Sequence, residues 1–441
     1  MTETNQKYKV FTLRNFDQIP QVQENLSQSQ IDAIEVVGNV LPFKVNNYVV
    51  DELINWDNIP DDPIFQLTFP QKEMLSPEHY HEMQTALAEE YSKAELKLVA
   101  NKIRHELNPH PAGQKSNVPT LGNEKLTGIQ HKYRETVLFF PSNSQTCHAY
   151  CTFCFRWPQF VGIEELKFAM KETDLLVAYL QHHPEVTDVL FTGGDPLVMS
   201  AKKLRQYIEP LLSADIPNLQ TIRIGTKALG YWPYRFISDK DSEELLQLFK
   251  EVGDKGIQLA FMSHFNHVNE LKTEAVRIAI DRILSTGAVI RTQSPIMNRI
   301  NNSAEDWIDM WKQQVKLKCI PYYMFVARDT GAQDYFAVTL EDAWKVYKKA
   351  YSSVSGIART VRGPSMSANP GKVQILGVNE IKGEEVFVLR FIQGRNPDWV
   401  GRPFFAKFDS DAIWLSDLEP ALDNEQFFFE NTMRKAVAEL N

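Results

Sequence analysis

The sequence of 441 residues has no apolar run near the roughly 18 residues that a membrane-spanning helix needs. Its first residues also lack the apolar core of a signal peptide. We therefore expect a cytoplasmic protein with no membrane partner. Basic residues are outnumbered, with 47 lysines and arginines against 56 acidic residues and a net charge of −9. Because no positive field would gather nucleic acid, the expected partner is a small molecule.

Cysteine is scarce, and four residues in a chain of this length exclude a disulfide scaffold. Three of them, Cys147, Cys151 and Cys154, form a CxxxCxxC pattern. Three thiolates on one short loop can hold three corners of an iron–sulfur cube and leave the fourth iron open to a substrate or cofactor. A structural zinc site closed by Cys319 or His148 is the alternative, although the sequence lacks the second CxxC pair typical of such sites. Three unrelated free cysteines remain a further alternative.

The hydrophobic pattern predicts an α/β protein in three parts. We expect a mostly helical N-terminal extension at 1–130, a partial (β/α)6 barrel at 131–375 and a small α+β appendage at 376–441. Strand-like runs separated by helical patterns favour a parallel sheet, whose functional residues follow the carboxyl ends of the strands. The six runs are TVLFFP (136–141), VTDVLFT (186–192), LQTIRIGT (219–226), IQLAFMSHF (257–265), AVIRTQSPI (288–296) and IPYYMFVA (320–327).

Residues 193–195, Gly193, Gly194 and Asp195, follow the second of these runs. Glycines permit close backbone approach and positive φ angles, so free backbone groups here could meet the amino-acid part of a nucleoside cofactor. Asp195 would be available for an ammonium group. A tight turn without a ligand explains the same residues.

Six motifs follow one another along residues 131–375: HKYRETVLFF (131–140), CHAYCTFCFR (147–156), GGDPL (193–197), IRIGT (222–226), SHFNHVNE (263–270) and QSPIMNRINN (293–302). The cysteine pattern and the GGDPL run resemble the radical S-adenosylmethionine (SAM) superfamily. More narrowly, the six motifs in this order resemble the lysine 2,3-aminomutase family.

The resemblance implies a radical-SAM-type partial barrel with a [4Fe–4S] cluster on Cys147, Cys151 and Cys154. SAM would bind the open iron, with its methionine end against Gly193, Gly194 and Asp195. It also implies that the cluster donates one electron and that SAM then yields methionine and a 5′-deoxyadenosyl radical, which takes a hydrogen atom from the substrate. A protein electron donor such as flavodoxin or ferredoxin is implied, and self-association into a homo-oligomer stays open.

In the aminomutases the substrate is bound to pyridoxal 5′-phosphate (PLP), and its amino group migrates between the α and β carbons. The lysine that holds PLP matches Lys372 in GPSMSANPGKVQIL (363–376), although the family's glycine-rich run is replaced here. An exposed loop lysine is the alternative. Thr136 also stands where the family has a basic residue, which leaves the phosphate side of a PLP site unassigned.

Substrate selection departs from the family at two positions. Where lysine-specific members have two aspartates for the distal ammonium, this chain has Asn302 and Arg362. Since an arginine would repel that ammonium, we predict an amino acid other than lysine, with an acidic one such as glutamate as the candidate. Arg299 or Arg328 would assist Arg362 in accepting a carboxylate. A surface salt bridge is the alternative role for Arg362.

The expected function is therefore that of an isomerase, a radical SAM aminomutase that moves an amino group within one amino acid. One alternative is a PLP-independent radical SAM enzyme acting on another small molecule. Another is a non-enzymatic protein that binds zinc or senses redox state through its cysteines. His264 and His267 follow a strand end and are expected to act as hydrogen-bonding scaffold.

Overall fold

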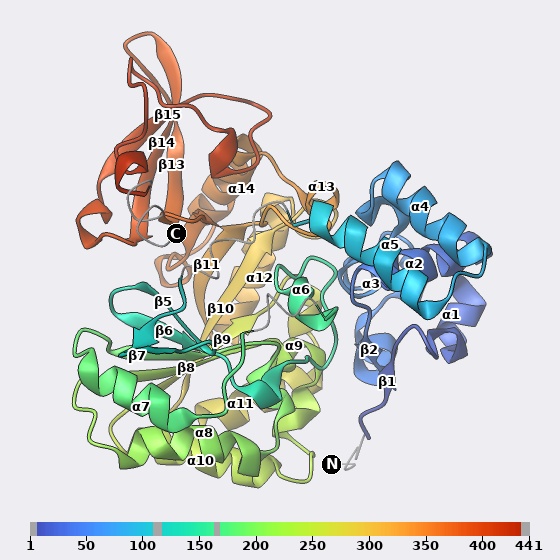
Figure 1. Cartoon of the computed structure of the whole chain (residues 1–441), viewed down its shortest axis with the longest axis horizontal. Coiled ribbons are helices and arrows are strands. Elements are labelled where there is room, and N and C mark those ends of the chain that lie inside the picture. The colour runs from blue at the N-terminus through green and yellow to red at the C-terminus, as the bar shows by residue number, and fades with distance from the viewer. Residues whose placement is uncertain (1–6, 109–116, 163–167, 434–441) are drawn as a thin grey trace.

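The computed structural model describes residues 7–108, 117–162 and 168–433. Its centre is an 11-stranded sheet in the order β15-β14-β13-β12-β11-β10-β9-β8-β7-β6-β5 (Figure 1). Neighbouring strands from β6 to β12 are parallel, while β5 and β13 to β15 pair antiparallel at the two sides. The strands are β5 (Ile129–Tyr133), β6 (Thr136–Phe139), β7 (Asp188–Phe191), β8 (Thr221–Thr226), β9 (Gln258–His264), β10 (Val289–Ile296), β11 (Ile320–Val326), β12 (Arg362–Ser367), β13 (Gly371–Ile381), β14 (Glu384–Gly394) and β15 (Pro403–Lys407).

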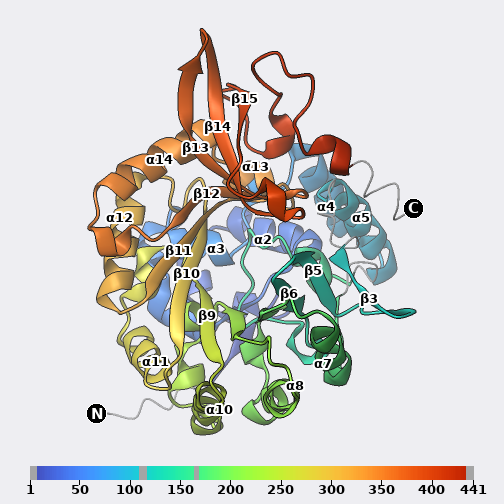
Figure 2. The same ribbon diagram turned by 90° about the vertical axis from the view of Figure 1, so that its left-hand side faces the viewer.

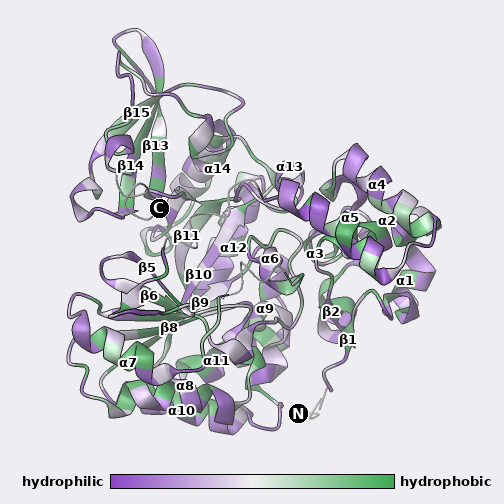
Figure 3. Cartoon of the chain, viewed as in Figure 1, coloured by the Kyte–Doolittle hydropathy of each residue, from purple (hydrophilic) through white to green (hydrophobic). Residues whose placement is uncertain are grey.

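Helices connect the parallel strands, and Figure 2 shows them around the outside of the strands. Their apolar residues recur at helical spacing, as in Leu204, Ile208 and Leu211 of α8, which are buried. Figure 3 shows the complementary hydrophilic faces turned away from the sheet. The helices are α7 (Thr173–His182), α8 (Ala201–Ser213), α10 (Ser242–Asp254), α11 (Glu274–Leu284), α12 (Ala304–Lys316) and α14 (Leu340–Ser352). In the described parts of the chain, no helix has the length and apolar character needed to cross a membrane.

Residues 7–108 lie beside the sheet and contain a short antiparallel pair and five α-helices (Figure 1). Helices α2, α4 and α5 pack on one another. The elements are β1 (Val10–Phe11), α1 (Pro20–Asn25), α2 (Gln28–Val40), β2 (Val45–Asn46), α3 (Pro63–Thr68), α4 (Pro77–Ala88) and α5 (Lys93–Glu106). A second short pair, β3 (Thr120–Leu121) and β4 (Glu124–Lys125), precedes the main sheet.

The mixed α/β architecture confirms the predicted fold class at the level of its content. All six predicted runs form strands, β6 to β11. The sequence analysis missed the seventh parallel strand, β12, because RGPSMS carries glycine and proline, which are rare in strands. Closure of these strands into a partial barrel stays a prediction.

The predicted chain divisions do not coincide with the ends of elements. The division at 130 falls within β5, and the division at 375 falls within β13. Strands β13 to β15 extend the main sheet, so the expected appendage is continuous with it. It has a core of its own, which includes Phe387, Phe391 and Phe404.

Candidate active site

The three cysteines lie on the loop that follows β6, at the carboxyl end of the parallel strands. Backbone bonds fold this loop tightly, with Cys154 N donating to Cys151 O at 3.1 Å. The N-terminal region holds it from outside, because Tyr150 N donates to Lys44 O at 2.8 Å and Thr152 N to Leu67 O at 3.0 Å. Lys44 Nζ adds a bond of 2.6 Å to the carbonyl oxygen of Cys147. Residues far away in sequence therefore fix the conformation of the cysteine loop.

The thiols lie close enough to influence one another. Burial raises the pKa of Cys147 well above its usual value, and Asp195 and the other two cysteines raise it further. Burial likewise raises the pKa of Cys151 to about 12. Three adjacent thiolates therefore need a positively charged ligand to be stable.

A cation also lies near each cysteine. Lys44 lowers the pKa of Cys147, Lys227 that of Cys151 and Arg156 that of Cys154. These cations would offset part of the negative charge of a cluster with three thiolate ligands. The donor set and its surroundings thus fit a [4Fe–4S] cluster.

The zinc alternative receives no support from Cys319. This thiol is buried just before β11, with Sγ 3.8 Å from Leu317 O, at the edge of the sheet where the parallel strands begin. The cysteine loop follows the opposite ends of these strands. Within the described residues, no group of three or more His, Cys, Asp or Glu side chains is arranged to hold a metal ion. A cubane cluster takes its thiolates at separate iron corners, so it does not need donors that converge on one ion.

Gly193, Gly194 and Asp195 pack directly against the cysteine loop. Gly194 N donates to Ser144 O at 2.9 Å and Asp195 N to Thr146 O at 2.7 Å. A Cβ on Gly194 would lie 2.2 Å from Thr146 O, and Gly193 has a φ of 144°, so side chains are excluded here. The two amides of Gly194 and Asp195 are therefore not the free backbone groups that the sequence suggested.

The Asp195 carboxylate is likewise engaged. It accepts bonds from Leu197 N at 3.0 Å, Lys227 N at 2.9 Å and Thr226 Oγ1 at 2.8 Å, and its residue is only 3% exposed. It thereby ties the end of β7 to the end of β8. SAM binding by residues 193–195 stays a prediction. In this structure the three residues pack against the start of the cysteine loop.

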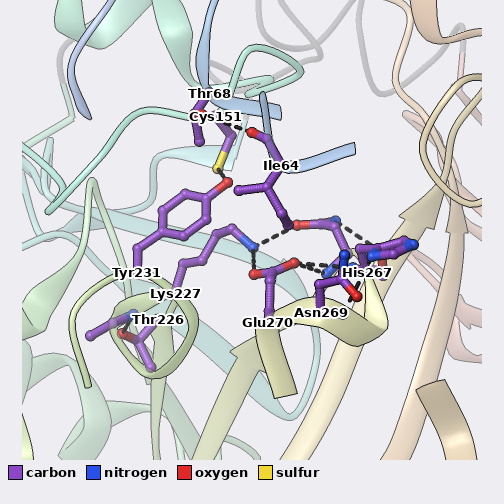
Figure 4. A network of polar contacts seen from close by, with 12 residues as sticks. Ile64, Thr68, Cys151, Thr226, Lys227, Tyr231, His267, Asn269 and Glu270 are labelled. Atoms are coloured by element: carbon purple, nitrogen blue, oxygen red, sulfur yellow. Dashed lines mark hydrogen bonds and ion pairs between the residues drawn. The ribbon is translucent and has the colours of Figure 1, made fainter. Parts of the chain in front are cut away.

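A buried ion pair that the sequence analysis missed lies beside Cys151 (Figure 4). Lys227 Nζ bonds to Glu270 Oε2 and to Asn266 Oδ1, the latter at 2.7 Å, and the Glu270 side chain is fully buried. The other carboxylate oxygen of Glu270 accepts the amides of Asn266 and His267. Tyr231 lies between this pair and the cysteine, with its hydroxyl 3.9 Å from Cys151 Sγ. The SHFNHVNE motif contained Glu270, but nothing in the sequence indicated that Lys227 was its partner.

The two histidines of that motif have different environments. His264 Nε2 lies 2.7 Å from Gln293 Nε2, and burial together with nearby Lys227 and Arg156 lowers its pKa to about 3. His264 is therefore neutral at physiological pH and suited to hydrogen bonding. His267 Nδ1 accepts the amide of Asn269 at 3.3 Å, which begins a helical turn.

Lys372 is not an exposed loop lysine, because it lies near the start of β13 and is partly buried. Its Nζ donates to Gln393 Oε1 at 2.9 Å and lies 4.2 Å from the ring centroid of Tyr323. Burial, together with the nearby Arg223 and Arg362, lowers its pKa to about 7. The neutral amine is the form that attacks a carbonyl group, and a lowered pKa increases its fraction at physiological pH.

Positive groups accumulate between Lys372 and the cysteine loop. Burial lowers the pKa of Lys132, and Lys372, Arg328 and Arg395 lower it further. Arg328 and Arg156 lie at 5.0 and 5.2 Å from the ring centroid of Phe155, the residue after Cys154. Arg328 Nε and Arg156 Nη1 are buried and have no hydrogen-bond partner among the residues that the structure describes. Buried donors of this kind fit an anionic ligand such as the phosphate of PLP.

The structure does not bring Asn302 and Arg362 together. Asn302 is exposed after β10, with Nδ2 3.1 Å from Asn298 Oδ1. Arg362 begins β12 level with Tyr323, and its guanidinium lies 4.9 Å from the ring of Tyr322. The expected assistants also differ in placement, because Arg299 is exposed and stacks on Tyr335 whereas Arg328 lies toward the cysteine loop.

Thr136 makes a contact within the sheet and is not among the cations near Lys372. It is at the start of β6, where its hydroxyl donates to Asp188 Oδ2 at 2.9 Å. The cations near Lys372 come from other segments instead, which the alignment of motifs did not indicate.

Comparison with known proteins confirms the resemblance read from the motifs. The chain is 29% identical over 394 residues to a putative L-lysine 2,3-aminomutase of Aquifex aeolicus, covering 89% of this chain and 92% of that protein. It is 25% identical over 347 residues to the L-lysine 2,3-aminomutase of Bacillus subtilis, covering 79% and 63%. No protein-family model matches the chain.

A solved radical SAM methyltransferase from Sphaerobacter thermophilus is 14% identical, with a TM-score of 0.37 over 53% of this chain and 68% of that one. A TM-score this low establishes neither a shared fold nor a shared function. The sequence relatives carry the name of a radical SAM family, and that family uses a [4Fe–4S] cluster and SAM. Within that class, its homologues are those named lysine 2,3-aminomutase.

Proposed function

We propose that this protein is a radical SAM aminomutase that uses PLP on Lys372 to move the amino group of an amino acid other than lysine. The observation that carries the proposal is Lys372 itself. It combines a pKa of about 7 with three aromatic neighbours, Tyr133, Tyr323 and Phe325, within 6 Å of Nζ. Such a lysine is suited to covalent bonding with a carbonyl cofactor, and a merely structural lysine gains nothing from it.

In this proposal the cysteine loop serves the iron–sulfur cluster and SAM. The side chains around Lys372, here called the Lys372 region, serve PLP, and they include Lys132, Tyr133, Tyr323 and Phe325. Cys147, Cys151 and Cys154 would hold a cluster that, together with SAM, would supply the radical chemistry for hydrogen-atom removal. Lys372 would hold PLP, which would supply the conjugated system for nitrogen migration. Between them, Arg156 and Arg328, both near the ring of Phe155, would bind anionic groups and limit the entry of water.

Substrate choice follows from the charges near Lys372. Arg223 pairs with Asp188, but Arg362 has no carboxylate partner among the described residues. A distal ammonium would be repelled by Arg362, whereas a distal carboxylate would be attracted. We therefore favour an acidic amino acid such as glutamate.

Borohydride trapping tests the cofactor. Reduction of the PLP-loaded protein should fix one PLP per chain on Lys372, located by peptide mass spectrometry. Lys132→Arg is the matched control, since Lys132 is another partly buried lysine in the same cationic region. An adduct on Lys132, or none at all, would favour the PLP-independent alternative.

An anaerobic substrate panel tests the reaction. Protein, SAM and reductant are incubated with deuterated amino acids, and deuterium should appear in 5′-deoxyadenosine with an acidic amino acid. Turnover of lysine with none of acidic amino acids contradicts the substrate assignment. A colourless protein that contains stoichiometric zinc contradicts the enzymatic proposal as a whole.

A further inference from the structure

A cavity of about 590 Å³ lies outside the cysteine loop, between this loop, the N-terminal region and the segments that lead into α8 and α10. It reaches the surface, because Lys202, Lys240 and Glu244 in its lining are exposed. Its lining includes Cys147, one of the three proposed cluster ligands. Lys44 lines the cavity too and bonds to the carbonyl of Cys147 at 2.6 Å. The cavity therefore leads from the surface to the cysteine loop.

Two aromatic side chains form part of the cavity wall. Tyr8 and Trp232 make an edge-to-face contact with ring centroids 4.9 Å apart. Tyr8 also donates its hydroxyl to His148 O at 2.6 Å, one residue after Cys147. Trp232 is buried and holds Tyr8, which is 39% exposed, and an exposed aromatic side chain held in this way is typical of contact surfaces.

The cations of the cavity are largely uncompensated. Lys44, Lys202 and Lys240 form no ion pair within the parts of the chain that the structure describes. This positive group stands out in a chain with a net charge of −9.

The acidic residues of the lining are mostly occupied. Arg235 bonds to Asp241 at 2.7 Å and lies 3.8 Å from Asp239. Trp232 Nε1 also donates to Asp239 at 3.2 Å. Only Glu244 opposes the three lysines with an exposed, unpaired carboxylate among the described residues. An acidic partner therefore fits this surface better than a basic one.

We infer that this cavity is the docking site of a small acidic redox protein that reduces the cluster. The inference rests on the proposed function, because it assumes a cluster on the three cysteines. One electron passes from the donor, which is oxidised, to the cluster, which is reduced, and no bond or proton need move.

The test reverses the charges of Lys202 and Lys240, two exposed lysines of the cavity lining that are called its rim here. In Lys202→Glu/Lys240→Glu, with the cluster assembled, reduction by reduced flavodoxin should slow about tenfold at low ionic strength, and the difference should shrink at high salt. The control is Lys312→Glu/Lys348→Glu, which makes the same charge change at exposed lysines on α12 and α14. Bleaching of the visible cluster absorbance under anaerobic conditions gives the rate.

A second reductant separates docking from damage to the cluster. The photogenerated 5-deazaflavin radical is small and carries no charge that the rim would attract, so its rate should be the same in all three proteins. The inference is overturned if both double variants slow equally with flavodoxin, if the rim variant does not slow, or if it slows equally with the deazaflavin radical. Failure of the wild-type protein to assemble a cluster would instead refute the proposed function.

Discussion

The cysteine loop and the Lys372 region are built in opposite ways. The loop is held by backbone bonds to Gly194 and Asp195 and to the N-terminal region, and an ion pair, Lys227 with Glu270, lies beside it. The Lys372 region is made of side chains on strands, with aromatic rings and cations and few carboxylates. Under the proposed function, one region would fix a metal cluster in place, whereas the other would bind anions around a lysine of lowered pKa.

Removal of a cluster ligand should have the largest effect. Cys147→Ala should abolish activity and bring iron well below the value of the wild-type protein, because two thiolates hold a cubane poorly. Cys319→Ala is the control, since this buried thiol should affect only stability, by about 1–2 kcal/mol. Iron analysis and visible absorbance measure both. Equal loss of iron in the two variants would show that the cluster is not on the loop.

Lys372→Ala should lower activity about 10³-fold or more, as removal of a covalently acting group does, and should leave the iron content unchanged. In the wild type, PLP attachment needs the neutral amine, so its rate should rise with pH and level off above about 7. Stopped-flow absorbance of PLP addition measures the profile. A rate that still rises above pH 9 would mean an ordinary lysine.

Breaking the ion pair beside the cysteine loop should cost about 3–5 kcal/mol of stability, because a buried carboxylate is left uncompensated. Lys227→Met tests this by urea unfolding. The double variant Lys227→Met/Glu270→Gln should recover part of the loss. No recovery would show that Glu270 acts through its bonds to the Asn266 and His267 amides alone.

Arg362→Gln tests the substrate assignment in the Lys372 region. We expect about a 10- to 100-fold loss of kcat/KM for an acidic amino acid, because one charge-assisted contact is lost. Arg299→Gln, an exposed arginine elsewhere, is the control. Unchanged kinetics in the Arg362 variant would remove the argument against lysine.

Lys44→Met should have the smallest effect of the five. Loss of the bond to the Cys147 carbonyl should destabilise the protein by about 1–2 kcal/mol, while Lys44→Arg should retain most of the stability. Thermal unfolding of the apoprotein measures it. If Lys44→Met unfolds at the same temperature as the wild type, the N-terminal region does not hold the loop through this residue.

Sequence reasoning succeeded where the signal is local. The CxxxCxxC spacing placed three thiols on one loop, and hydrophobic runs placed strands β6 to β11. Because neighbouring parallel strands end at one edge, residues 193–195 could also be expected next to that loop. The role of Asp195 was less predictable, since its three hydrogen-bond donors come partly from β8.

Sequence reasoning failed where partners come from distant segments. Asn302 follows β10 and Arg362 begins β12, and their joint role toward a substrate stays a prediction. The ion pair of Lys227 and Glu270 was missed because forty-three positions separate its members. No local pattern encodes such a contact.

By itself the sequence determined the identity of the thiols, their spacing and the order of strands and helices, since each depends on neighbours within a few residues. Only the tertiary structure decided that Lys44 reaches Cys147 and that Lys372 is partly buried among aromatic rings and arginines. Burial and charge depend on which segments meet in space. They therefore set the pKa of a lysine in a way that its neighbours in the chain do not reveal.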